Sequence, residues 1–162
     1  MHNFVSTYDN KQIVEDLNGL ISIDYQTMDL YDQAAQEVHN AAYQSTLETF
    51  RQETLRHIQE LTNAIEQLGG EPTQQKKAKH LQLDDLNDSE ILHDADVLEQ
   101  IKQNEIKVNV LYERFFQKYA GKLEINCLLK NGLDDERRHK KWLKTTIAAL
   151  KEDEFEQVTF VP

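Results

Sequence analysis

Carboxylate and imidazole side chains interrupt the apolar stripes of four predicted helices, and they are the residues most able to do chemistry. Glu136 and His139 stand three residues apart within DDERRHKKW, so both lie on one face of a helix. Oxygen and imidazole ligands suit iron or manganese, which favours a buried metal site. Without metal, the same residues would form a polar layer that fixes helix register through hydrogen bonds. The full set of interruptions is Asp24, Thr54, His57, Glu105, Glu136 and His139.

These interruptions lie at similar distances from two predicted hairpin turns. Asp24 lies between four and five helical turns before the hairpin turn near Asn40, and His57 lies between four and five after it. Around the hairpin turn near Gly121, Glu105 lies between four and five helical turns before and His139 lies five after. On antiparallel helices, equal distance from a hairpin turn means equal height. We therefore expect all the interruptions to fall in one layer of the core.

The two halves of the chain repeat each other. Asp24 is followed by Tyr31 after seven positions, and Glu105 by Tyr112 after seven. The separation in sequence between Asp24 and His57 differs by only one position from the separation between Glu105 and His139. The matched spacing indicates two copies of one helical hairpin.

Buried carboxylates are costly unless a proton or a cation compensates their charge. Two divalent cations would do so in this layer. We expect Glu136 and His139 to hold one ion while Glu105 bridges from the third helix, and Asp24 and His57 to hold the other.

Four apolar stripes of helical period predict an all-α four-helix bundle in a single domain, residues 1–162. A helix of about 28 residues is about 42 Å long, and about 20 extended residues reach about 66 Å. The second linker can therefore run back along the bundle and join two antiparallel hairpins by one long crossover. The predicted segments are helices at about 11–39, 41–68, 89–120 and 123–151, a crossover at 69–88 and an extended tail at 152–162.

Composition excludes several other classes. The chain has 162 residues with only five glycines and two prolines, which suits long helices. It has no apolar run long enough to cross a bilayer, so we expect no membrane span. Its first residues lack the basic start and apolar stretch of a secretory signal, so we expect none. A single cysteine, Cys127, fits a cytoplasmic location, and a net charge of −11 argues against a nucleic-acid partner. No motif for an organic cofactor is present. The short basic cluster of Arg137, Arg138, Lys140 and Lys141 is expected to be solvent-exposed.

The chain resembles the ferritin-like superfamily of di-iron and di-manganese carboxylate proteins, in which each hairpin supplies a Glu, a Tyr seven positions later and a Glu-x-x-His. The second half matches in full through Glu105, Tyr112, Glu136 and His139. The LNGLISID and LGGEP segments are similar to a group of bacterial ferritin-like bundle proteins of unassigned function. The resemblance covers about residues 11–150. It implies that Tyr31 and Tyr112 hydrogen-bond the ligand carboxylates.

The first half departs from that pattern, because Asp24 replaces the first Glu and Thr54 replaces the Glu of Glu-x-x-His. Three carboxylates would leave two divalent cations with about one excess positive charge, which hydroxide, an oxo bridge or an outside anion would balance. Glu53, four positions before His57, is a candidate substitute ligand, and Thr54 would stand beside the ligands. A single-metal site on Glu105, Glu136 and His139 is the alternative arrangement.

These features predict a protein that binds one or two iron or manganese ions per chain. If it is an enzyme, it is a di-iron-type oxidoreductase that oxidises ferrous iron or reacts with oxygen or peroxide. The alternative is a metal-free bundle with a stress-related or structural role. The partners expected are metal ions, with a homodimer or an iron-storing cage left open.

Overall fold

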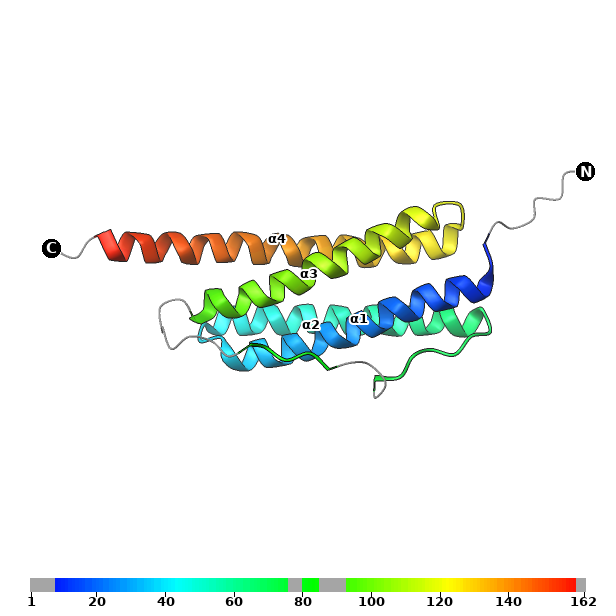
Figure 1. The fold of residues 1–162 in the computed structure, drawn as a ribbon, viewed down its shortest axis with the longest axis horizontal. Coiled ribbons are helices and arrows are strands. Elements are labelled where there is room, and N and C mark those ends of the chain that lie inside the picture. The colour runs from blue at the N-terminus through cyan, green and yellow to red at the C-terminus, as the bar shows by residue number, and fades with distance from the viewer. Residues whose placement is uncertain (1–7, 76–79, 85–92, 160–162) are drawn as a thin grey trace, which may run out of the picture.

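The computed structural model describes residues 8–75, 80–84 and 93–159, and it contains four long helices. No strand occurs in those ranges, and the predicted all-α four-helix bundle is confirmed. Figure 1 shows two helical hairpins lying against each other. None of the described helices combines the length and the apolar character needed to cross a membrane. The helices are α1 (Asn10–Glu37), α2 (Ala41–Gln67), α3 (His93–Lys118) and α4 (Leu123–Thr159).

Side-chain caps and a glycine define the ends of the first hairpin. The Asp9 carboxylate accepts a hydrogen bond from the Lys11 amide at 3.0 Å and begins α1. The side-chain carbonyl oxygen of Asn40 accepts from the Ala42 amide at 2.8 Å and begins α2. After α2, Gly69 has φ of 77°, a left-handed conformation that glycine adopts without a steric penalty.

The described parts of the crossover, residues 69–75 and 80–84, contact α1 at two heights. Near the start of α1, the Asn18 side-chain amide donates to the Glu71 carbonyl at 3.0 Å, and nearer its end the Gln33 amide donates to the Leu81 carbonyl at 2.7 Å. Asp94, at the start of α3, accepts from the Asn40 amide at 3.0 Å. Helix α3 therefore starts where α2 starts and runs parallel to it. This is the predicted connection of two antiparallel hairpins by one crossover.

The interior consists of two apolar clusters with the polar layer between them. One cluster contains Leu17, Ile21 and Leu129, and the other contains Ala34, Leu98 and Leu143. Both clusters draw on all four helices, so the helices hold the polar residues of the layer in fixed register.

The end of α4 differs from the prediction. The helix continues to Thr159, whereas the sequence predicted an end near Lys151 and an extended tail from residue 152. Residues 151–157, KEDEFEQ, contain mostly good helix formers and no Gly or Pro, so nothing stops the helix. The predicted first residues of the third helix, 89–92, lie outside the described residues. Helix α1 ends at Glu37 and α3 at Lys118, each two positions earlier than predicted.

Candidate metal centre

Four helices contribute ionisable side chains to the polar layer. The layer residues are less than 3% exposed, so water does not solvate their charges. Asp24 comes from α1, His57 from α2, Glu105 from α3, and Glu136 with His139 from α4. The structure thus brings together the five side chains that the sequence singled out as ligands.

The five side chains form two groups that share one carboxylate. Asp24, His57 and Glu136 make one group, and Glu105, Glu136 and His139 make the other, each with ligand atoms within 4.8 Å of one another. The Nδ1 atom of His57 lies 3.1 Å from one oxygen of Glu136, and Nδ1 of His139 lies 3.5 Å from the other. The sequence prediction gave the bridging position to Glu105. In the structure, Glu136 is the carboxylate common to both groups, so we take it as the candidate for the shared position.

Each imidazole is held from its outer side by an acid of the opposite hairpin. Asp135 of α4 lies 2.9 Å from Nε2 of His57, and Glu53 of α2 lies 2.5 Å from Nε2 of His139. A carboxylate at Nε2 fixes the ring orientation and leaves Nδ1 facing the centre of the layer. Asp135 was missed in the sequence, although an acid directly precedes Thr54 and Glu136 in the two repeats.

Two tyrosines cross between the hairpins to the inner carboxylates. The hydroxyl of Tyr112 on α3 donates to Oδ2 of Asp24 on α1 at 2.6 Å. The hydroxyl of Tyr31 on α1 donates to Oε1 of Glu105 on α3. Each tyrosine therefore orients the carboxylate of the other half and leaves that carboxylate's second oxygen free for another partner.

Glu53 and Thr54, the two further residues named from the sequence, are engaged by partners outside the two groups. Glu53 is absent from both groups, because its carboxylate lies behind His139 and also binds Arg138 at 2.8 Å. It is one helical step away from position 54, which rotates it by about 100° toward the surface. The Thr54 hydroxyl donates to the Phe50 carbonyl of its own helix at 2.9 Å, so its proton is not available to a neighbouring carboxylate.

Gly132 makes room for one of the tyrosines. A Cβ atom at this position would lie 2.5 Å from Cε1 of Tyr112, which is too close for any real contact. Helix α4 is continuous through the position, so the glycine marks no break. The missing side chain lets the Tyr112 ring pass and reach Asp24.

Asn109 ties α3 to α4 beside the layer. Its amide donates to the carbonyl of Glu105 at 2.8 Å and to the carbonyl of Glu136 at 3.0 Å. The backbone segments that carry these two carboxylates are therefore held together. No sequence pattern indicated this role, because a buried asparagine on a helix face has no distinctive spacing.

The pKa values of the layer residues are shifted in different directions. Burial and repulsion by Glu136 raise the pKa of Asp24 to about 8, and the same two causes raise the pKa of Glu105 well above its ordinary range. Burial alone would raise the pKa of Glu136, but the nearby His139 and His57 outweigh burial and hold this pKa below its usual range. Burial lowers the pKa of His57, and its contacts with Glu136 and Asp24 outweigh this and raise it to about 9.

The inner atoms of the layer lack hydrogen-bond partners, although they are the atoms that metals prefer. Nδ1 of His57 is close to Glu136, yet the geometry makes no hydrogen bond. Buried polar atoms without partners are rare in folded proteins and point to an ion or water. The donor set of carboxylate oxygens and imidazole nitrogens fits iron or manganese. The orphaned inner atoms are Asp24 Oδ1, His57 Nδ1, Glu105 Oε2 and both carboxylate oxygens of Glu136.

Comparison of the sequence with known protein families gives one match. Residues 12–79 match a family described as a domain of unknown function (DUF2383), which is less than half of the chain. No curated protein matches the sequence.

Several solved structures are similar over most of their length. The bacterioferritin-related dodecameric thioferritin of Bacteroides fragilis has a TM-score of 0.77 at 23% identity, covering 90% of this chain and 91% of its own. A ferritin-like, diiron-carboxylate protein of Bacillus anthracis str. Ames has a TM-score of 0.72 at 23% identity, covering 87% and 99%. The Rhodobacter capsulatus bacterioferritin, solved with a metal-free dinuclear site, has a TM-score of 0.71 at 17% identity, covering 88% and 87%.

These likenesses agree with the four-helix bundle described above. At identities of 23% and below, these structures establish the fold of the chain. The chain has the ferritin-like four-helix-bundle fold.

Proposed function

We propose that the polar layer binds two divalent iron or manganese ions. Asp24 and His57 hold one ion, Glu105 and His139 hold the other, and Glu136 is shared by both. The observation that carries this proposal is the set of buried carboxylate oxygens and the His57 nitrogen that face one another without hydrogen-bond partners. Two cations would satisfy these atoms and compensate the buried negative charge.

The charge balance implies one further small ligand. Three carboxylates carry −3, and two divalent ions carry +4, so about one positive charge remains when both imidazoles are neutral. Position 54 supplies no fourth carboxylate, because threonine occupies it. Hydroxide or a small anion from solvent would complete the balance, so the site is open to an outside ligand.

The supporting residues fix the ligands before any ion arrives. Tyr31 and Tyr112 orient the two terminal carboxylates, while Asp135 and Glu53 orient the two imidazoles. Phe50 stacks on the His139 ring with centroids 4.1 Å apart and limits its rotation. Ferrous ions held there would supply electrons for the reduction of oxygen or peroxide, the oxidoreductase chemistry that we propose. The similarity in fold to a diiron-carboxylate protein supports this chemistry. We also propose a cytoplasmic location.

Elemental analysis tests the proposal directly. Protein purified without an affinity tag or chelator, then incubated anaerobically with ferrous iron and desalted, is expected to retain about two ions per chain. The matched variant Glu136→Ala removes the shared ligand and is expected to retain almost none. Fewer than about 0.2 ions per chain in the wild type, unchanged in the variant, would contradict metal binding. That result would support a metal-free bundle with a structural or stress-related role.

A further inference from the structure

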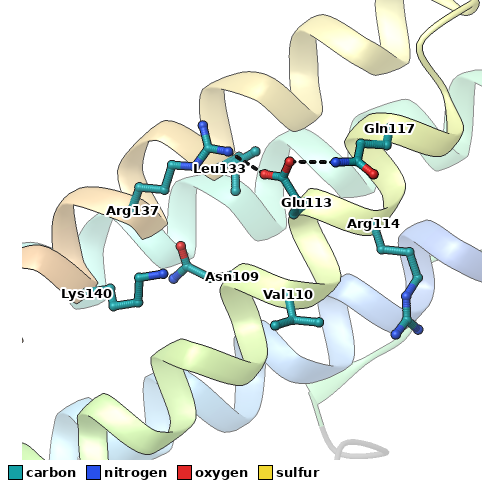
Figure 2. A pocket seen from close by; sticks show the side chains of 8 residues that line it. All are labelled: Asn109, Val110, Glu113, Arg114, Gln117, Leu133, Arg137 and Lys140. Carbon is teal, nitrogen blue, oxygen red and sulfur yellow. Dashed lines mark hydrogen bonds and ion pairs between the residues drawn. The ribbon is translucent and has the colours of Figure 1, made fainter.

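The outer surface between α3 and α4 carries a basic groove. Figure 2 shows Lys140 of α4 and Asn109 of α3 extending toward each other across it, with Val110 and Arg114 along the α3 side. The groove has a volume of about 500 Å³. Val110 is 54% exposed, so the groove also presents apolar surface to solvent. We call this surface the α3–α4 groove.

The charge of the groove is opposite to that of the whole chain. Arg114, Arg137 and Lys140 contribute three positive charges and Glu113 one negative, a formal charge of +2 in a chain of −11. Glu113 is already engaged, because it accepts from both Arg137 and Gln117. An acidic partner that also offers apolar side chains would complement the groove.

The end of α4 has the complementary chemistry. Residues 152–159, which we call the acidic arm, extend past the other helices in Figure 1. Phe155 is 72% exposed and Val158 is 69% exposed, so both rank among the most exposed large apolar side chains of the described residues. Four acids surround them, namely Glu152, Asp153, Glu154 and Glu156.

The spacing along α4 places arm and groove residues on one face. Phe155 follows Arg137 by five full helical turns, and Val158 follows Lys140 by the same interval. One stripe of α4 therefore begins in the α3–α4 groove and ends in the acidic arm, about 27 Å away at about 1.5 Å per residue. The stripe is basic at one end and acidic with apolar residues at the other.

We propose that two copies of this chain associate through antiparallel α4 helices, with the acidic arm of each copy in the α3–α4 groove of the other. A twofold axis near the middle of the stripe brings both pairs of complementary surfaces together at once. The groove carries a formal charge of +2 and residues 152–156 contain four acidic side chains, so the two surfaces attract. Phe155 and Val158 leave solvent on contact with the apolar part of the groove. This association does not depend on bound metal.

Two charge-reversal variants test the proposal. One is the triple variant Arg114→Glu, Arg137→Glu and Lys140→Glu, which reverses the basic residues of the groove, and the other is Glu152→Lys, Glu154→Lys and Glu156→Lys. Light scattering after size exclusion at low salt is expected to show a dimer for the wild type and a monomer for each triple variant. An equimolar mixture of the two variants is expected to restore the dimer, because the reversed surfaces complement each other. Circular dichroism verifies that each variant remains helical.

A matched pair of apolar substitutions separates the arm from general surface hydrophobicity. Phe155→Ser is expected to weaken the dimer, whereas Leu123→Ser, at a residue 75% exposed at the other end of α4, is expected to leave it unchanged. A monomeric wild type overturns the proposal. An assembly of any size that persists in both triple variants, or a mixture that stays monomeric, also overturns it.

Discussion

The two halves of the polar layer share one supporting structure but differ at two candidate ligand positions, with Asp24 against Glu105 and Thr54 against Glu136. In both halves a histidine presents Nδ1 inward and binds an acid of the opposite hairpin through Nε2. In both halves a tyrosine of the opposite hairpin holds the terminal carboxylate. Only the first half lacks a carboxylate at the Glu-x-x-His position, where Thr54 stands. The fold thus keeps the complete supporting structure around an incomplete ligand set.

Because the first half lacks a carboxylate at position 54, Glu136 is the carboxylate that both candidate groups contain. In the second half it joins Glu105 and His139, and in the first half it completes the ligand group of Asp24 and His57. The first half therefore depends on a residue of the second hairpin, while the second half has its own full set. The two halves are expected to respond differently to substitution.

Replacement of the shared carboxylate is expected to have the largest effect. Glu136→Gln keeps the size of the side chain but removes its charge, so both ions are expected to be lost. Asp24→Asn is the matched control and is expected to lose only the ion of the first half. Isothermal titration with manganese distinguishes the two patterns. Retention of two ions by Glu136→Gln would show that the halves do not share a ligand.

Replacement of Asp135 or Glu53, the acids on the outer side of the imidazoles, is expected to have the second-largest effect on metal affinity. Asp135→Asn and Glu53→Gln each loosen one imidazole, and such changes typically lower metal affinity by about 10- to 100-fold. Asp135→Asn is expected to weaken the first half and Glu53→Gln the second. The same titration measures both variants, with Asp134→Asn at an exposed neighbouring position as the control. Equal effects from all three substitutions would contradict separate support of the two halves.

A carboxylate at position 54 is expected to change metal affinity less than these substitutions, and to raise it rather than lower it. Thr54→Glu supplies a fourth negative charge and is expected to raise affinity in the first half by about tenfold, or about 1.4 kcal/mol. Without metal the extra buried carboxylate is expected to lower the melting temperature. Thr54→Val has similar size and no charge, and it is expected to leave metal affinity unchanged. An unchanged affinity in Thr54→Glu would place the first-half ion elsewhere.

The stability of the metal-free protein is expected to fall modestly as pH rises. The pKa of Asp24 is raised from 3.8 to about 8, so its stabilising contribution is complete below 3.8 and lost as pH rises through 8. The pKa of His57 is raised from 6.5 to about 9, so its contribution is complete below 6.5 and lost as pH rises through 9. Asp24 therefore lowers the free energy of unfolding from about pH 4 to 8 and His57 from about pH 6.5 to 9, so stability falls most steeply where both act, between about pH 6.5 and 8.

Thermal unfolding at several pH values measures this slope. Asp24→Asn does not titrate and is expected to have a shallower dependence on pH, while manganese is expected to oppose the loss in the wild type. A metal-free wild type that gains stability over this pH range would contradict the charge distribution of the layer.

Much of the fold followed from patterns within single helices. The apolar period located all four helices, and equal distances from Asn40 and Gly121 placed the interruptions in one layer. The sequence suggested Glu105 for the shared position, whereas Glu136 is common to both candidate groups, because spacing along one helix does not show which carboxylate faces both neighbours. Asp135 and Asn109 act through contacts between helices, which no single stripe reveals. The end of α4 was also missed, since the core-facing apolar stripe stops at Leu150 while helix propensity continues.

Anomalous scattering from crystals grown with manganese or ferrous iron tests the central claim most directly. The account predicts two peaks, one between Asp24, His57 and Glu136 and the other between Glu105, Glu136 and His139, with Glu136 within coordinating distance of both. Peaks confined to the protein surface, or none in the layer at saturating metal, would contradict it.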